Sequence, residues 1–383
     1  MSGPSRWRLT DDQQEYVEWV RQVGAEQLAP LAEQGTEGRV NRQLVRKLGE
    51  LGLLARLFPG GKEDATDRRA AALDLCLLRE ALAQVCTEAE TALALQGLGA
   101  YPIVLAGTTA QYGAWVPRVA AGEVVPAYAL SEPDAGSDAA ALQLAAVPDG
   151  SGWRLTGEKT WISNAPEADV YSVFARTTPG AGARGVTAFI VPADRPGLDG
   201  EHLGMVSPHP IGRLTFDGVP VERAEMLGEV DRGFGLAMRT LDLFRPSVGA
   251  FAVGMAQAAL DAAVSYAATR QAFGGPLAGQ QVVAHTLAEL ATRVEAARLL
   301  VYRAGAAYDE GRPDVAVTSA MAKLVATETA QYVVDAAIQV HGASGLQRGH
   351  LLEHLYREVR APRIYEGASE VQREIIARHL LRS

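Results

Sequence analysis

The chain of 383 residues has very few cysteines, only Cys76 and Cys86. The two form no CxxC pair and are too few for a disulfide framework of the kind that stabilises small secreted proteins. The segment before residue 15, MSGPSRWRLTDDQQ, also lacks the apolar core of an export signal. We therefore expect a protein of the reducing cytoplasm.

Positive charge is also in short supply. Lysine and arginine number 36 against 45 acidic residues, which gives a formal net charge of −9. Nucleic-acid binding needs clustered Lys and Arg, and docking on anionic lipid needs a basic surface, so neither partner is expected. No apolar stretch looks long enough to cross a bilayer. The composition, 48% hydrophobic and 21% charged, fits a soluble globular protein.

Several common functional motifs are missing. No GxGxxG follows a predicted strand, so a dinucleotide-binding Rossmann unit is not indicated. The segment FPGGKED lacks the remainder of a phosphate-binding loop, and HGASGL misses the GxSxG nucleophile elbow by one residue. Nucleotide-triphosphate and serine-hydrolase chemistry therefore have no support.

One motif that is present, HLLEH at His350–His354, matches an inverted zinc-binding pattern. Two histidines four residues apart can share a helical face and bind a metal. A five-residue pattern arises easily by chance, however, and no distal carboxylate identifies itself as a third ligand. We therefore interpret the segment as a polar stretch and expect no metal.

The periodicity changes twice along the chain. About the first 120 residues are helical in pattern and open with a capping box, Thr10 with Gln13. Short β-branched and aromatic runs separated by turn residues follow, and long Ala-rich helices begin after Gly233, with Pro246 expected to kink or delimit the first. We predict a mostly α fold with a central β domain: helical residues 1–122, a β-barrel at 123–228 and a helical bundle at 229–383.

Four segments carry the functional signal: AYALSEPDAGSD (Ala127–Asp138), GEKTWISNA (Gly157–Ala165), RQAFGGPLAGQQ (Arg270–Gln281), and QVHGASG together with YEGASE near the end. In this order and spacing, over nearly the whole chain, they resemble the acyl-CoA dehydrogenase family of flavoproteins. The resemblance implies FAD as cofactor, a four-helix bundle at the C-terminus, and assembly into a homo-oligomer, at least a dimer and by resemblance a tetramer.

Within this resemblance the first three segments hold the flavin. Trp161 packs on the ring, and Ser163 donates toward the ring nitrogen that accepts the hydride. The Arg270 fork meets the pyrophosphate of a neighbouring subunit's cofactor. Gly136 and Ser137 are expected to form a tight turn near the flavin phosphates or the substrate arm. The other positions that match cofactor contacts are Tyr128, Leu130, Ser131, Phe273, Gln281, Gln339, Gly342 and Ala343.

Glu366 matches the catalytic base. In the family such a glutamate removes the α-proton of an acyl thioester while the β-hydrogen leaves as hydride, giving the trans-2-enoyl thioester. Exclusion of water would raise the pKa of the carboxyl toward that of the bound substrate, and the Glu366 backbone N–H would stabilise the developing charge on the thioester oxygen. Gly367 keeps bulk away from the reacting carbon, and Tyr365 lines the acyl pocket.

The chain departs from the family pattern at several positions. Ala368 replaces a threonine that contacts the flavin, which removes one hydrogen bond worth about 1 kcal/mol. Glu370 stands where relatives have Glu or Gln. Some branches place the base at the position of Phe244, which cannot take a proton, so Glu366 is the sole candidate. Phe244 and Arg245 are expected at the substrate, and Leu93 and Leu95 at the far end of an apolar acyl pocket.

Two alternatives to this dehydrogenase remain open: a flavin oxidase or monooxygenase of the same fold that uses oxygen, and a non-catalytic scaffold. The resemblance also implies an electron-transfer flavoprotein as electron acceptor. Neither the acyl chain length nor the carrier, coenzyme A or an acyl carrier protein, follows from the sequence.

Overall fold

The computed structural model describes residues 9–58 and 70–382, which fall into two compact units. The helical unit comprises Met1–Gln27, Ala71–Glu90 and Asp242–Ser383. The sheet unit comprises Leu28–Ala70 and Thr91–Leu241. The division predicted from the sequence has three parts that follow one another along the chain. Each of the two observed units is instead built from segments that are separate in the sequence. The three-part division therefore stays a proposal.

The helices of the chain confirm the predicted helical regions at both ends. Those before the sheet are α1 (Asp11–Val23), α2 (Ala29–Ala32), α3 (Arg42–Glu50), α4 (Ala72–Ala83), α5 (Thr87–Ala106) and α6 (Thr109–Ala120). Those after it are α7 (Gly233–Thr269), α8 (Gln281–Asp309), α9 (Val315–His341), α10 (Leu351–Val359) and α11 (Ser369–Arg382). The predicted capping box closes the start of α1, where the Thr10 hydroxyl accepts from the Gln13 amide.

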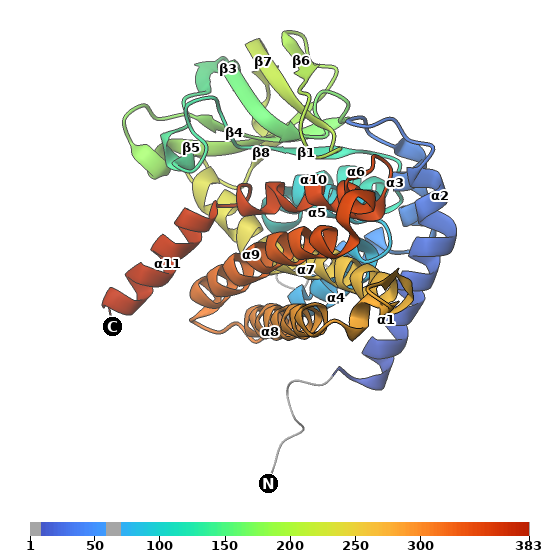
Figure 1. Cartoon of the computed structure of the whole chain (residues 1–383). Helices are drawn as coiled ribbons and strands as arrows, with labels where there is room; N and C mark the ends of the chain where they lie inside the picture. The colour runs from blue at the N-terminus through green and yellow to red at the C-terminus, as the bar shows by residue number, and fades with distance from the viewer. Residues whose placement is uncertain (1–8, 59–69, 383) are drawn as a thin grey trace. The chain divides into compact units, whose positions relative to one another are not determined.

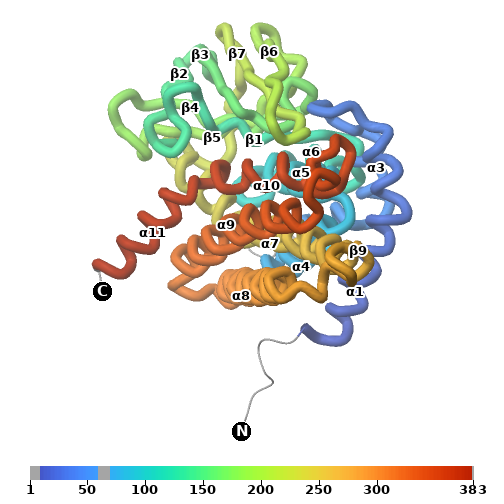
Figure 2. The backbone as a smooth tube through the Cα atoms, in the orientation of Figure 1, coloured from blue at the N-terminus to red at the C-terminus, as the bar shows by residue number. Residues whose placement is uncertain are grey.

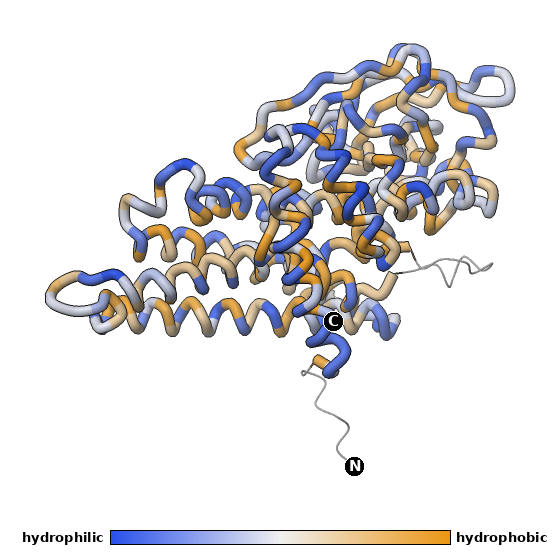
Figure 3. The backbone as a smooth tube through the Cα atoms, turned by 90° about the vertical axis from the view of Figure 1, so that its right-hand side faces the viewer, coloured by the Kyte–Doolittle hydropathy of each residue, from blue (hydrophilic) through white to orange (hydrophobic). Residues whose placement is uncertain are grey.

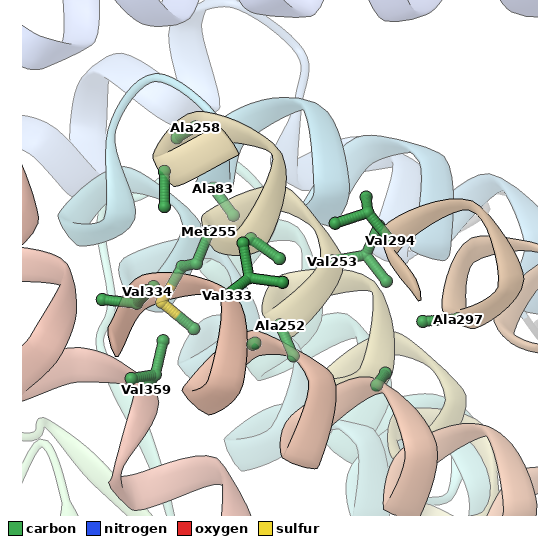
Figure 4. Close-up of a cluster of buried hydrophobic side chains, with 14 of the residues drawn as sticks. Ala83, Ala252, Val253, Met255, Ala258, Val294, Ala297, Val333, Val334 and Val359 are labelled. Atoms are coloured by element: carbon green, nitrogen blue, oxygen red, sulfur yellow. The ribbon is translucent and has the colours of Figure 1, made fainter. Parts of the chain in front are cut away.

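The core of the helical unit is built from small side chains, which lets long helices approach closely. Figure 1 shows α7, α8 and α9 side by side, and Figure 4 shows alanine and valine side chains from α4, α7, α8, α9 and α10 meeting in one cluster. A Cβ built at Gly254 of α7 would lie 2.4 Å from the Glu80 carbonyl oxygen in α4. Glycine is therefore required at this crossing. Hydrophobic and hydrophilic residues alternate along the long helices (Figure 3).

Helix α7 differs from expectation in two respects. It continues through Pro246 from Gly233 to Thr269, so the proline does not end it. Pro246 lies where α7 enters the helical unit, and its missing N–H leaves the carbonyl of Asp242 without a helical donor. The helix is also long and apolar enough to cross a membrane, which corrects the expectation that no stretch is; 78% of the apolar window is buried inside the structure, as in a core helix.

The sheet unit contains an eight-stranded sheet with the order β6-β7-β3-β2-β4-β5-β8, and β1 pairs with β4 (Figure 2). The strands are β1 (Pro126–Ala129), β2 (Ala145–Asp149), β3 (Gly152–Ser163), β4 (Val170–Arg176), β5 (Val186–Pro192), β6 (Leu198–His202), β7 (Ile211–Val221) and β8 (Met226–Leu227). The β1–β4 and β2–β4 pairs are parallel, and the other strand pairs of this sheet are antiparallel. A separate two-stranded hairpin pairs β9 (Gln271–Ala272) with β10 (Gly275–Pro276).

Candidate active site

The structure divides the predicted site residues between the two units. The sheet unit carries the residues expected at the flavin ring and the acyl chain: Leu93, Leu95, Tyr128, Leu130, Ser131, Ser137, Trp161 and Ser163. The helical unit carries the proposed base with its neighbours and the residues expected at the nucleotide part of FAD: Phe244, Arg245, Arg270, Phe273, Gln281, Gln339, Gly342, Ala343, Tyr365, Glu366, Gly367, Ala368 and Glu370.

In the sheet unit, the two predicted flavin segments are joined directly. The Thr160 amide donates to the Ser131 carbonyl at 3.0 Å. The ammonium of Lys159, which is completely buried, donates at 2.8 Å both to the Leu130 carbonyl and to Glu132 Oε1. The segment after β1 and the end of β3 therefore form one rigid surface, held by a buried ion pair that the sequence reasoning missed.

Glu132 is the centre of this joint. Its carboxylate also accepts from the backbone amides of Gln143 and Leu144, the latter at 2.9 Å. Burial lowers the pKa of Lys159 to about 8, against the attraction of Glu132, which raises it. The hydrogen bonds and the opposite charge are what allow both groups to lie in the interior.

Trp161 occupies an irregular point of β3. Its φ is +59°, and the register with β7 shifts between Lys159 and Ile162. Such a shift turns a side chain out of the regular strand alternation, and here it leaves the Trp161 ring 55% exposed. The hydroxyls of Ser131 and Ser163 form no hydrogen bond within the described residues. An exposed aromatic ring flanked by available hydroxyls fits the edge and face of a flavin.

The loop after β1 is more compact than predicted. The tight turn lies at Pro133–Asp134, closed by reciprocal backbone hydrogen bonds between Glu132 and Ala135. Gly136 and Ser137 lie in the bend that follows and not in the turn itself, which corrects the expectation. A Cβ at Gly136 would meet no atom within 4 Å, so open space adjoins this backbone.

The remaining predicted residues of the sheet unit are largely buried. The Tyr128 hydroxyl donates to the Ala237 carbonyl at 3.2 Å, and its ring packs on Phe174. Leu130 and Leu93 are buried, and Leu95 is partly exposed. Tyr128 and Leu130 therefore offer a ligand mainly their backbone groups.

In the helical unit, Glu366 lies in a left-handed turn between Arg363 and α11, with φ of +52°, followed by Gly367 at +94°. Its Oε2 atom is buried and has no hydrogen-bond partner within residues 9–58 and 70–382. No acceptor for the Glu366 backbone N–H is found in the same residues. A strained backbone that presents a buried, unpartnered carboxyl oxygen is the arrangement expected where a proton is to be removed.

Burial and the neighbouring charges shift the pKa of Glu366 in opposite directions. Burial raises the pKa of its carboxyl above the ordinary value, and the cations of Arg79, Lys323 and Arg245 oppose that rise, Arg79 most strongly. A carboxyl with a raised pKa is, once ionised, a stronger base than a solvated carboxylate.

Two side chains that were not predicted from the sequence donate hydrogen bonds to the backbone of this turn. Lys323 Nζ, from α9, donates to the carbonyls of Tyr365 at 3.1 Å and Gly367 at 2.7 Å. Gln372 Nε2 donates to the Gly367 carbonyl at 2.8 Å. A Cβ at Gly367 would lie 2.5 Å from this Nε2 atom, so the glycine serves both the left-handed backbone and this contact. Lys323 is a charged residue in the largely apolar helix α9, and this contrast was visible in the sequence. Gln372 lies in the largely polar helix α11, where one more polar residue gives no such signal.

A second buried ion pair, Arg79 with Glu90, lies in the same unit. The Arg79 guanidinium also donates to the Ser247 hydroxyl at 2.6 Å. Ser247 in turn donates to the carbonyl of Phe244, whose side chain is fully buried. Arg245 pairs with Asp242 on the same helix at 3.1 Å. Arg79, in a helix whose other charged residues are Asp74 and Glu80, could have been noticed in the sequence.

The helical-unit residues expected at the nucleotide part of FAD are all exposed. The Arg270 guanidinium forms no ion pair within the part of the chain that is described. Phe273, in the β9–β10 hairpin, is 92% exposed at φ of +53°. The other exposed members are Gln281, Gln339, Gly342 and Ala343. Glu370 is also exposed and pairs with Arg373 at 3.0 Å, and Ala368 is partly exposed.

The HLLEH histidines are separately engaged. His350 caps α10 by accepting from the Leu352 amide, and His354 bonds the Thr87 hydroxyl at 2.6 Å. Residues 9–58 and 70–382 contain no group of three His, Cys, Asp or Glu side chains placed to hold a metal. Both cysteines are free and buried.

Comparison with known proteins finds similarity to one family along nearly the whole chain. Residues 10–123, 127–219 and 231–381 match the N-terminal, middle and C-terminal domains of acyl-CoA dehydrogenases. The cyclohexane-1-carbonyl-CoA dehydrogenase of Geobacter metallireducens is 34% identical over 374 residues, 96% of each chain. The human mitochondrial short-chain specific acyl-CoA dehydrogenase is 37% identical over 100% of this chain and 97% of its own.

Solved structures share the fold. Butyryl-CoA dehydrogenase from Megasphaera elsdenii superposes with a TM-score of 0.90 at 35% identity, covering 100% of both chains. A chain from the study of the electron transferring flavoprotein of Acidaminococcus fermentans gives 0.91 at 34%, covering 98% of this chain and 100% of that one. PigA with FAD and proline gives 0.90 at 26%, with the same coverage. The chain therefore belongs to the acyl-CoA dehydrogenase family, and it is an FAD-dependent oxidoreductase that acts on CH–CH bonds.

Proposed function

We propose that the protein converts a saturated acyl thioester to the trans-2-enoyl thioester, with Glu366 as the base that removes the α-proton. The observation that carries this assignment is the buried, unpartnered Oε2 atom of Glu366. A solvated loop carboxylate would be bonded by water and would keep an ordinary pKa, whereas burial raises the pKa of this one.

The chain's own residues account for three parts of the reaction. Glu366 Oε2 takes the α-proton. The Glu366 backbone N–H, which has no acceptor among the described residues, donates to the thioester carbonyl and stabilises the charge that develops there. The left-handed turn fixes both groups on one short piece of backbone, so that proton removal and charge stabilisation act on the same substrate.

FAD, when bound, supplies the ring that accepts the β-hydrogen as hydride. Trp161, Ser131 and Ser163 would hold that ring, since the indole is exposed and the two hydroxyls are unpartnered within the described residues. The exposed Arg270 and Phe273 would serve the cofactor of a second subunit. The proposal therefore includes a homo-oligomer, a tetramer by resemblance, which light scattering on the purified protein would test.

Coenzyme A thioesters are the proposed substrates, since the relatives with printed substrates act on them. The acyl group is proposed to be apolar because Leu93 and Leu95 match positions at the far end of the family's acyl pocket. An electron-transfer flavoprotein is the proposed acceptor, and the cytoplasm the proposed compartment. An acyl-carrier thioester in the same assay would decide between carriers.

The test is anaerobic mixing of the yellow holoprotein with a panel of acyl-CoA thioesters. We expect loss of the flavin absorption and appearance of the enoyl product, both abolished in Glu366→Gln. Glu374→Gln is the matched control, because Glu374 is an exposed glutamate of α11 that pairs only with Arg378 among the described residues. Bleaching that survives Glu366→Gln would defeat the assignment of the base. Rapid reoxidation by oxygen with hydroxylated product would favour the monooxygenase, and a preparation that refuses FAD would favour the scaffold.

A further inference from the structure

The backbone that carries Glu366 adopts a conformation that must be held by its surroundings. Two consecutive residues, Glu366 and Gly367, have φ of +52° and +94°. For a glutamate this region is strained, and such conformations persist only where neighbouring contacts impose them. The carbonyls on either side of the Glu366 side chain, those of Tyr365 and Gly367, are the groups through which the turn can be fixed.

Lys323 supplies the contact that reaches both carbonyls. Its ammonium donates to Tyr365 O at 3.1 Å and to Gly367 O at 2.7 Å, so one cation bridges the residues that flank Glu366. The side chain projects from the middle of α9 and is completely buried. Within the described residues it forms no ion pair at 4.0 Å or less. A buried lysine bonded to neutral carbonyls is uncommon, because buried charges are usually paired.

We propose that Lys323 is a positioning residue for the proposed base: its ammonium fixes the two carbonyls that flank Glu366 and brings a positive charge that favours the ionised form of the Glu366 carboxyl. This inference rests on the proposed function, since it assigns Lys323 a role in that reaction. Lys323 touches neither substrate nor cofactor in this account and acts only through the turn.

The charges that face the two groups are consistent with this role. Glu366 is influenced by Arg79 on α4, Arg245 on α7 and Lys323 on α9, and all three favour its ionised form. Burial lowers the pKa of Lys323 to about 8; Glu366, Glu328 and Glu370 raise that pKa, and Arg245 lowers it. Arg79 and Arg245 already have carboxylate partners, Glu90 and Asp242. Of these three cations, Lys323 alone has no carboxylate partner at ion-pair distance among the described residues.

Gln372 allows the charge of Lys323 to be separated from its hydrogen bonds. It is fully buried and donates to the Gly367 carbonyl at 2.8 Å and to the Glu366 carbonyl at 3.4 Å, but it carries no charge. Losing Gln372 should loosen the turn without changing the electrostatic potential at Glu366. Losing Lys323 should loosen the turn and also change the electrostatic potential at Glu366.

The experiment is an infrared titration of the ligand-free holoprotein, in which the carbonyl band of protonated Glu366 is identified by its absence in Glu366→Gln. In Lys323→Met we expect the midpoint of this band to move up by about one pH unit, because an opposite charge near a carboxyl lowers its pKa by at least that much. Lys323→Gln, which keeps donors without charge, should show the same shift, and it serves if the methionine variant does not fold. Gln372→Leu should leave the midpoint in place.

Anaerobic flavin reduction against pH provides the second readout. The acidic limb of the rate should move with the infrared midpoint in both Lys323 variants, so that the rate at a pH below the midpoint falls about tenfold. Gln372→Leu should lower the rate equally at every pH. Thr327→Val is the control on the same helix, since its hydroxyl bonds only carbonyls of α9, and it should change neither readout.

An unchanged infrared midpoint in folded, FAD-loaded Lys323→Met or Lys323→Gln would overturn the inference while leaving the proposed function intact, provided that Glu366→Gln stays inactive. If Glu366→Gln reduces its flavin at the wild-type rate, the proposed function fails first. The two failures are thus distinguished by which variant departs from expectation.

Discussion

The buried pair of Lys159 and Glu132 offers a quantitative test of how the flavin-binding surface is held. Replacing Lys159 by Met removes the cation but leaves the Glu132 carboxylate in the interior with only the amides of Gln143 and Leu144 as donors. Breaking one side of a buried ion pair typically costs about 3–5 kcal/mol, so we expect a loss of about 3 kcal/mol in the free energy of unfolding. The Leu130 carbonyl also loses its 2.8 Å hydrogen bond.

The effect of Lys159→Met on the free energy of unfolding should also depend on pH. Burial lowers the pKa of Lys159 to about 8, below the 10.5 of an unfolded lysine. Between these values the unfolded chain binds more protons than the folded one, so the free energy of unfolding rises with pH. The full difference of 2.5 units corresponds to about 3 kcal/mol. Lys159→Met should lack this rise, and the gap between wild type and variant should therefore widen from pH 8 to pH 10.

Urea unfolding followed by circular dichroism at several pH values measures both effects. A double-mutant cycle with Glu132→Gln isolates the pair, and we expect the double variant to lose much less than the sum of the two single losses. Additive losses, or a Lys159→Met variant whose stability follows that of wild type from pH 8 to pH 10, would refute the reasoning.

Three further predictions follow from the site. Gly367→Ala places a side chain on a backbone at φ of +94° and within 2.5 Å of Gln372 Nε2, so it should cost about 1–2 kcal/mol and slow flavin reduction; an unchanged melting temperature and rate would contradict this. Arg79→Gln leaves Glu90 buried without its cation and should lower stability by about 3 kcal/mol in calorimetry, whereas a neutral effect would show that the pair is dispensable. Arg270→Ala, at an exposed position, should weaken FAD binding about tenfold in equilibrium titration without destabilising the FAD-free protein, and equal affinity would remove Arg270 from the cofactor site.

Much of the fold followed from local patterns. The short β-branched and aromatic runs predicted for the central β domain form strands such as β3, β4, β5 and β7, because such runs bounded by turn residues favour strands. Strand β6, with the sequence LDGEH, was missed because it has neither alternation nor β-branched residues. Its place at the edge of the sheet comes from pairing with β7, a long-range contact that a local pattern does not contain.

Site residues that belong to a short sequence motif could be predicted. Site residues that come together only through packing of distant segments could not. Glu366 and Trp161 were identified from short segments, yet the left-handed backbone at both depends on the surrounding structure. Lys323 lies 43 residues before Glu366 and Lys159 lies 27 residues after Glu132, so only the folded chain brings each pair of groups together. Neither lysine could be assigned a partner from spacing alone.

The most direct test of the central claim is the rate of a single anaerobic turnover with an acyl-CoA that carries deuterium on the α-carbon. We expect α-deuteration to slow flavin reduction severalfold in the wild type, and Glu366→Gln to show no reduction on the same timescale. Flavin reduction in Glu366→Gln at the wild-type rate, with the same isotope effect, would contradict the claim that the Glu366 carboxyl removes the α-proton.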